Sequence, residues 1–147
     1  MKEAYFESVV MIERLHRLFL EVIKAELDGM NIHDINNVQC LILYNIGKGK
    51  VTVGELTNRG YYLGSNVSYN LRKMVQNGYL VQEPSPHDRR SSHVTLSSKG
   101  TELYNNLDDM LKAQIDTLKS KGMLEEINVL GKTLKKLENF WNELKSR

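Results

Sequence analysis

The sequence is poor in the residues that build disulfides and metal sites. It contains one cysteine, Cys40, and four histidines among 147 residues. A single cysteine cannot form an internal disulfide, and no Cys-x-x-Cys or paired histidine spacing offers a zinc site. We therefore expect no disulfide framework, no structural metal and no cofactor.

Long apolar segments are missing as well. The apolar runs are only a few residues long, far below the roughly 20 residues that span a bilayer. The N-terminus also lacks the basic and then apolar layout of a signal peptide. With 41% hydrophobic residues, the chain can still bury a core as a single domain over residues 1–147. We expect a cytoplasmic protein that does not bind membranes.

Catalytic motifs are also missing. The sequence has no Gly-rich phosphate loop, no nucleophile elbow and no His-Glu-x-x-His pair. Its carboxylates alternate with lysines in helical segments, as they do on solvated helix faces. We expect no catalytic residues and no enzymatic activity.

Positive charge is small overall but unevenly distributed. The net charge of the chain is +2, whereas residues 59–100 hold six basic and two acidic residues and so carry +4. Such an asymmetry is more informative than the net charge. The middle of the chain is therefore the place to look for contacts with nucleic acid.

Both ends of the chain have the periodicity of long helices. Residues 3–28 carry apolar side chains at steps of three and four, and the breadth of this stripe predicts a well-buried helix. A second long helix is predicted over residues 98–120, with Ser97 as its cap and Gly122 as the residue that breaks it. The last, over residues 123–145, has a heptad seam that needs another helix against it; the seam consists of Met123, Ile127, Leu130, Leu134, Leu137, Trp141 and Leu144.

Shorter elements fill the middle. Helices are predicted over residues 34–46, from Thr52 to near Gly60, and over residues 65–77. Thr52 and Glu55 have the spacing of a capping box, and Gly78 is suited to end the third of these helices.

Two β-favouring runs follow, over residues 79–83 and 93–97, separated by a nine-residue loop with both prolines of the chain. This pattern is typical of a hairpin with a long tip. Two helices joined by a tight turn and followed by a hairpin make a winged helix-turn-helix. The predicted fold is mainly α with a small β-hairpin: a lobe over residues 34–97, and dimerisation helices over residues 3–28 and 98–145.

The tip of the hairpin carries the most specific motif. Residues 85–91 read Ser-Pro-His-Asp-Arg-Arg-Ser, and residues 94–100 read Val-Thr-Leu-Ser-Ser-Lys-Gly. This segment resembles the MarR family of bacterial transcription regulators, whose wing reads Asp-Pro-x-Asp-x-Arg-(Ser/Ala) before a Val-x-Leu-Thr-x-x-Gly helix start. The order of helices and hairpin along nearly the whole chain is also that of the family.

The resemblance assigns roles to the wing residues Asp88, Arg89 and Arg90. It implies that Asp88 pairs with the arginines and shapes the tip, while Arg90 enters the minor groove of DNA. A guanidinium suits a narrow groove with a concentrated negative potential. The alternative is a solvated turn whose charges keep the hairpin edge soluble, and the two prolines that stiffen this loop argue against it.

The predicted helix over residues 65–77 has polar side chains off its apolar stripe of Val67, Leu71 and Met74. Asparagine can pair with adenine, arginine with guanine, and serine or tyrosine with phosphate. We predict that the DNA-contacting residues of this helix are Ser65, Asn66, Ser68, Tyr69, Arg72 and Lys73. The alternative for any one of them is an ordinary polar residue that faces solvent.

These observations together predict a sequence-specific DNA-binding transcription regulator that binds double-stranded DNA as a homodimer. Two recognition helices would meet half-sites about 10 bp apart in a pseudo-palindromic operator. The resemblance further implies a small-molecule effector, and occupancy of promoter DNA makes repression the simpler expectation. The alternative function is a winged helix that binds only other proteins.

A few residues keep open roles. The turn before the recognition helix departs from the family pattern at Thr57 and at Gly60-Tyr61-Tyr62, and the two tyrosines could pack, line a cleft or contact DNA. His16, Arg17 and Tyr44 could line a ligand cleft, although their spacing identifies no ligand and we assign no ligand-binding residue. Cys40 has no basic neighbour to activate it, which favours a buried thiol over a redox sensor.

Overall fold

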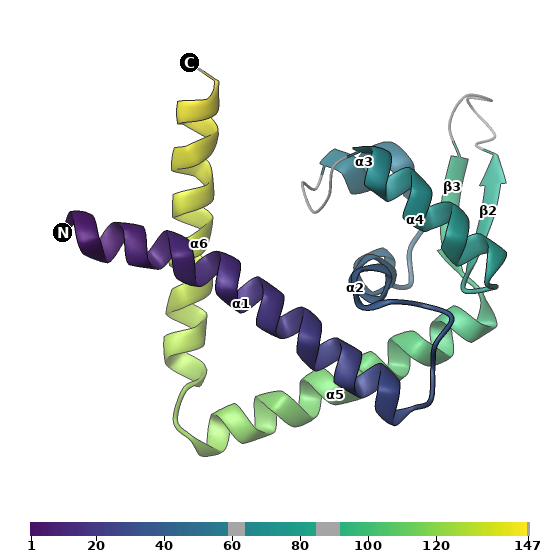
Figure 1. Cartoon of the computed structure of the whole chain (residues 1–147), viewed down its shortest axis with the longest axis horizontal. Coiled ribbons are helices and arrows are strands. Elements are labelled where there is room, and N and C mark those ends of the chain that lie inside the picture. Colours follow the sequence, from purple (N-terminus) through teal and green to yellow (C-terminus); the bar gives the residue numbers. More distant parts are fainter. Residues whose placement is uncertain (59–63, 85–91, 147) are drawn as a thin grey trace. The chain divides into compact units, whose positions relative to one another are not determined.

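The computed structural model describes residues 1–58, 64–84 and 92–146 (Figure 1). The side chains of residues 57–58 and 64–65 lie outside this description. The chain divides into two compact units, Met1–Asn105 and Asn106–Arg147. Each unit is described by itself below.

The elements follow each other in the order of a winged helix-turn-helix, with a long helix before it and two after it. They are α1 (Lys2–Gly29), α2 (Asn37–Ile46), β1 (Val51–Thr52), α3 (Val53–Asn58), α4 (Gly64–Gln76), β2 (Leu80–Pro84), β3 (Ser92–Leu96), α5 (Ser98–Ser120) and α6 (Leu124–Lys145). The fold is mainly helical with a small antiparallel sheet, as the sequence predicts.

The sheet has three strands in the order β1-β3-β2. The predicted hairpin is present as β2 and β3, which pair antiparallel from Leu80 opposite Leu96 to Pro84 opposite Ser92. The short strand β1 adds Val51 opposite Val94 on the other edge of β3. This third strand was not predicted, because two residues are too few to show an alternating pattern.

The core of the first unit lies between α2, α4 and the sheet. From α4 it takes Val67, Leu71 and Met74, none more than 4% exposed. From the other elements it takes Cys40, Ile42, Leu43, Ile46, Val51, Leu56, Tyr79, Leu80 and Val94. The 67, 71, 74 spacing places the three α4 side chains on one face of the helix. The burial of this face fixes the rotation of α4 about its own axis.

Local capping decides where several elements begin and end. Asn36 accepts a hydrogen bond from the Gln39 N–H at 2.8 Å, and Gln39 Oε1 accepts one from the Asn36 N–H at 3.1 Å. This capping box starts α2 at Asn37, so the predicted start at residue 34 is wrong. The predicted stops are confirmed at Gly78 and Gly122, whose φ angles of 84° and 71° suit glycine.

Helix α1 is far less buried within its unit than its broad apolar stripe predicted. Only Ile23 and Leu27 are buried along its 28 residues. Large apolar side chains of α1 that stay exposed are Tyr5, Phe6, Leu15, Leu18 and Val22. The prediction fails because the helix is long and α2 contacts only part of it. The periodicity of a helix shows which side chains share a face, and it does not identify what covers them.

Helix α6 has no buried residue in the isolated chain. Its exposed large apolar side chains are Leu124, Ile127, Val129, Leu130, Leu134, Phe140 and Leu144. Four of these belong to the predicted heptad seam, and contiguous apolar surface of this kind marks an interaction site. In the part of the chain that the structure describes, no helix is both long and apolar enough to cross a membrane.

Candidate nucleic-acid interface

Helix α4 presents a polar face opposite its buried one. Of the residues predicted to contact DNA, those with described side chains are all exposed: Asn66, Ser68, Tyr69, Arg72 and Lys73. Tyr69, Arg72, Lys73 and Gln76 line a shallow surface pocket along this face. The structure thus gathers the predicted set on one solvent-facing side of α4, with the exception of Ser65, whose side chain lies outside the description.

A polar contact in the middle of α4 holds it against α2. The Gln39 amide is buried, and its Nε2 donates to Asn70 Oδ1 at 3.2 Å. The Asn70 Nδ2 in turn donates to the Asn66 carbonyl, one turn earlier, at 2.8 Å. Asn70 therefore belongs to the support of the helix and not to its outward face. No local sequence signal pointed to this contact, because Gln39 and Asn70 are 31 residues apart.

The C-terminal end of α4 closes tightly into β2. The Gly78 N–H donates to the Val75 carbonyl at 3.0 Å, and the Tyr79 N–H donates to the Met74 carbonyl at 2.9 Å. These bonds and the positive φ of Gly78 form the glycine-capped helix end that turns the chain sharply. The chain then enters β2, which leads to the wing.

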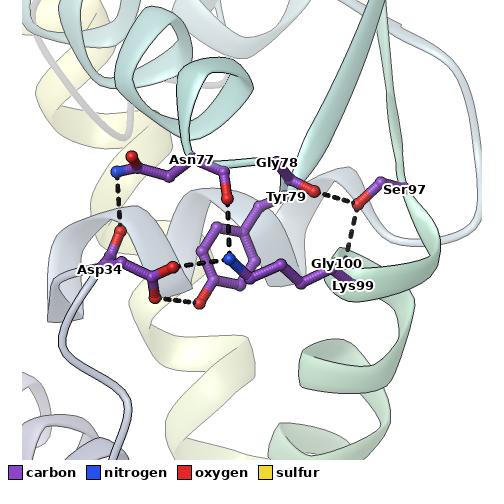
Figure 2. Close-up of polar contacts among 7 residues, drawn as sticks. All are labelled: Asp34, Asn77, Gly78, Tyr79, Ser97, Lys99 and Gly100. Carbon is purple, nitrogen blue, oxygen red and sulfur yellow. Dashed lines mark hydrogen bonds and ion pairs between the residues drawn. The ribbon is translucent and has the colours of Figure 1, made fainter.

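Asp34, in the connection before α2, joins two other elements at this point (Figure 2). Its Oδ1 accepts a hydrogen bond from the Tyr79 hydroxyl at 2.5 Å, and its Oδ2 accepts one from the Lys99 ammonium at 2.6 Å. Lys99 also donates to the Asn77 carbonyl at 2.8 Å and lies 4.3 Å from the centre of the Tyr79 ring. The Asn77 side chain donates to the Asp34 carbonyl at 2.9 Å. We call Asp34, Asn77, Tyr79 and Lys99 the clasp.

The clasp shifts the pKa values of Asp34 and Tyr79 in opposite directions. The hydrogen bond from Lys99, followed by that from Tyr79, lowers the pKa of Asp34 below its usual 3.8. Burial, followed by the hydrogen bond to Asp34, raises the pKa of Tyr79. At neutral pH the clasp therefore contains an ionised carboxylate and a neutral phenol. Its contribution to stability is present above about pH 4 and is lost as the pH falls through the lowered pKa of Asp34.

The first turn of α5 lies directly against the same end of α4. Ser97 Oγ donates to the Gly78 carbonyl at 2.6 Å and accepts from the Gly100 N–H at 3.0 Å, so it caps α5 as predicted. The Ser97 N–H donates to the Tyr79 carbonyl at 3.0 Å. A Cβ on Gly100 would overlap the Tyr79 carbonyl oxygen, which makes glycine necessary for this close approach.

The predicted wing residues Asp88, Arg89 and Arg90 lie outside the described residues, as do Tyr61 and Tyr62 of the turn. The strands that carry the wing are described. The base of the wing is held by β2 and β3, where Gln82 Nε2 donates to Ser92 Oγ at 2.8 Å across the strands. The roles assigned to the wing therefore stay predictions.

The structure describes contacts of Tyr44 and Arg17, two of the residues considered for a ligand cleft. Tyr44 stacks on Tyr104 with ring centres 4.8 Å apart and an interplanar angle of 13°. Arg17 lies 3.7 Å from Glu13 in an exposed pair along α1, and His16 is exposed. Tyr44 thus packs α2 against α5, and the structure adds no support for a ligand-binding residue.

Comparison with known proteins identifies the chain. A family model described as the MarR family matches residues 33–91. The curated exopolysaccharide II synthesis transcriptional activator ExpG of Rhizobium meliloti (strain 1021) is 36% identical over 139 residues, which are 93% of this chain and 71% of that protein. The chain belongs to the MarR family. Its relatives are transcription regulators and not enzymes.

Solved structures of MarR-family proteins share the fold over nearly the full length. Streptococcus pneumoniae FabT, solved in complex with DNA, is 25% identical, has a TM-score of 0.76, and covers 95% of this chain and 99% of its own. A MarR protein from Peptoclostridium difficile is 20% identical with a TM-score of 0.77, covering 95% and 91% of the two chains. This MarR-family chain is accordingly a winged-helix, DNA-binding transcription regulator.

Cys40 of this MarR-family protein is fully buried in α2. Burial raises the pKa of its thiol to about 12. Because only the thiolate reacts, such a thiol is inert at physiological pH.

We therefore expect iodoacetamide at pH 8 to alkylate Cys40 far more slowly in the native protein than in the denatured protein. Mass spectrometry over a time course measures the two rates. DNA binding should survive peroxide treatment, because the reactive form of the thiol is almost absent. A peroxide-driven loss of DNA binding that Cys40→Ser abolishes would contradict this.

Proposed function

We propose that this protein is a homodimeric, sequence-specific regulator that reads a pseudo-palindromic operator with α4 in the major groove. The observation that carries the proposal is the two-faced character of α4. One face is buried through Val67, Leu71 and Met74, and the opposite face exposes Asn66, Ser68, Tyr69, Arg72 and Lys73. A helix held in this way offers base-reading and phosphate-binding side chains together.

The wing supplies the second contact in this proposal. Arg90 enters the minor groove next to the site of α4, while Asp88 pairs with the wing arginines and shapes the tip. Support comes from the motif itself and from β2 and β3, the two paired strands that flank the motif in the sequence. The FabT structure with DNA supports DNA as the partner of this fold. A winged helix that binds only proteins would not require basic residues on both the helix and the wing.

Dimerisation explains the apolar surface of the long helices. Helices α1 and α6 expose large apolar side chains that no part of their own unit covers. Two copies of the chain that bury these faces together would form an isologous interface, in which the same patch is used on both subunits. The two-fold axis would then place two α4 helices on successive turns of DNA.

Ligand response is the part of the proposal with the least local support. A small-molecule effector would act by binding more tightly to a dimer whose lobe spacing does not fit DNA, and so release the operator. Neither the pocket on α4 nor the Tyr44 and Tyr104 stack identifies the chemistry of such an effector. We assign it no residues.

The central test is DNA binding by the purified protein to the region upstream of its own gene, titrated with salt. We expect log K to fall linearly with log salt as phosphate contacts are lost. Arg90→Ala and Arg72→Ala should each weaken binding by about 1–3 kcal/mol, because each removes a groove contact. Arg14→Ala, an exposed arginine of α1, is the matched control and should bind as the wild type does. Binding to neither this fragment nor pooled genomic DNA would favour the protein-binding alternative.

The oligomeric state gives a second test. Light scattering at micromolar concentration should give twice the 16.9 kDa mass of the chain. Leu134→Asp should shift the protein toward monomer, because an unpaired carboxylate buried in an interface is costly. Asn128→Asp, which adds the same charge on the opposite side of α6, is the control and should remain dimeric. A wild-type mass near that of one chain would refute the dimer.

The direction of regulation has two candidates. Repression follows from occupancy of promoter DNA, whereas activation is favoured by the name of the relative ExpG, a transcriptional activator. We expect added protein to lower the transcript yield from its upstream region in purified transcription, with a footprint over the polymerase site. A higher yield with a footprint upstream of that site would instead establish activation.

A further inference from the structure

The clasp brings together three segments that are distant in sequence. Asp34 precedes α2, Asn77 and Tyr79 lie in the turn between α4 and β2, and Lys99 lies in the first turn of α5 (Figure 2). Each of the two carboxylate oxygens of Asp34 has its own donor, at 2.5 Å from Tyr79 and at 2.6 Å from Lys99. A carboxylate bound through both oxygens is fixed in orientation as well as in position.

Lys99 is the link between α5 and the end of α4. Its ammonium donates to the Asn77 carbonyl at 2.8 Å, directly after the last residue of α4. A cation at this place is favourable, because the final carbonyls of a helix lack partners and carry partial negative charge. The Tyr79 ring lies beneath the same ammonium at 4.3 Å. Lys99 therefore has acceptors from two different elements and an aromatic face.

The clasp cannot be explained by stability alone. The Lys99 and Asp34 side chains are 47% and 46% exposed. A half-exposed ion pair is screened by solvent and contributes little to the free energy of folding. What the clasp does provide is geometry, since one carboxylate accepts hydrogen bonds both from Tyr79, just after α4, and from Lys99 in the first turn of α5. The Ser97 bonds and the close approach of Gly100 act at the same junction.

The start of α2 extends this junction toward α1 and the middle of α4. Asn37 Nδ2 donates to the Leu20 carbonyl of α1 at 3.1 Å, and Gln39 Nε2 donates to Asn70 of α4 at 3.2 Å. Within six residues, from Asp34 to Gln39, the chain bonds to α1, α4, the residue before β2, and α5. Movement of either long helix at this point must therefore move α4 or break these bonds.

We propose that Asp34, Tyr79 and Lys99 are positioning residues for DNA binding. They contact no DNA themselves, and they set the position of the α4 C-terminal end relative to α5. A change of the α5 position is thereby passed to the face of α4 that meets the major groove. This inference rests on the proposed reading of DNA by α4, and it adds the device that aligns the helix.

The sign of the effect separates positioning from simple electrostatics. Asp34→Asn removes one negative charge, so an effect of charge alone would tighten the binding of DNA. The clasp predicts the opposite, because the uncharged amide has only one acceptor oxygen and cannot accept from both Tyr79 and Lys99. We expect affinity for the operator fragment to fall roughly 2- to 30-fold, the range found for changes in coupled networks. Asp28→Asn, an exposed carboxylate at the end of α1, removes the same charge and should not weaken binding.

The experiment measures full-length protein binding to the fragment upstream of its own gene and to random-sequence DNA, as a function of salt. The variants are Asp34→Asn, Lys99→Met, the double variant, Tyr79→Phe and Asp28→Asn. The clasp variants should lose affinity for the operator and keep their affinity for random DNA. The double variant should lose less than the product of the two single losses, because both changes break one interaction. The salt slope should stay at the wild-type value.

Each other outcome has a definite meaning. If the slope of log K against log salt is smaller for Lys99→Met than for the wild type by about one released counterion, Lys99 contacts a phosphate directly. That result would overturn the inference. If the clasp variants lose equal affinity for both DNAs and stoichiometric titration shows a lower active fraction, the clasp acts only on folding. The conservative variant Tyr79→Phe, which removes a single hydroxyl, checks this outcome. If Arg72→Ala weakens binding and the clasp variants do not, the inference about the clasp fails while the proposed function stands. If Arg72→Ala and Arg90→Ala also have no effect, the proposed function fails.

Discussion

Val67, Leu71 and Met74 pack one face of α4 into the core, and this burial fixes which side of the helix meets the solvent. Burying a large apolar side chain contributes roughly 1.5–3 kcal/mol, so rotation of α4 about its axis would expose three such residues at once. The polar residues on the opposite face are therefore held outward by the core and not by contacts of their own. The DNA-binding role depends on this constraint first.

The lobe and the long helices use apolar residues in different ways. Inside the lobe, apolar side chains of α2, α4 and the sheet are buried within a single chain. On α1 and α6 apolar faces stay exposed in the isolated chain, although their sequences also repeat apolar residues at helical spacing. The lobe can thus fold around its own core, whereas the long helices carry surface that a second chain can bury. In the proposed dimer, this separation would let one part bind DNA while another sets the spacing of the two copies.

The start of α2 connects these two kinds of structure. Its polar side chains bond to α1 through Asn37, to α4 through Gln39, and to α5 through Asp34. Each bond is modest in energy, and the exposed ion pair contributes about 0–1 kcal/mol at most. These bonds matter for orientation, because a hydrogen bond requires a defined angle as well as a defined distance. A regulator needs such orientation, since its DNA-binding helix must fit a groove of fixed width.

Much of this protein could be predicted from the sequence because the deciding signals are local. The order of the helices follows from apolar periodicity, and Gly78, Ser97 and Gly122 mark ends that the structure confirms. The family follows from the wing motif and the helix order. The spacing of three apolar residues predicts which face of α4 is buried. The exposed face is then the opposite one.

The rest was decided by tertiary structure. The sequence did not predict β1, whose two residues become a strand only by pairing with β3. It also gave no sign that Asp34, Tyr79 and Lys99 meet, because they are separated by 45 and 20 residues and no single motif contains all three. The burial predicted for α1 was wrong within the chain, since a periodic stripe does not reveal its partner. Sequence determines which side chains share an element and a face, and only the packed fold determines which distant groups come within hydrogen-bonding distance.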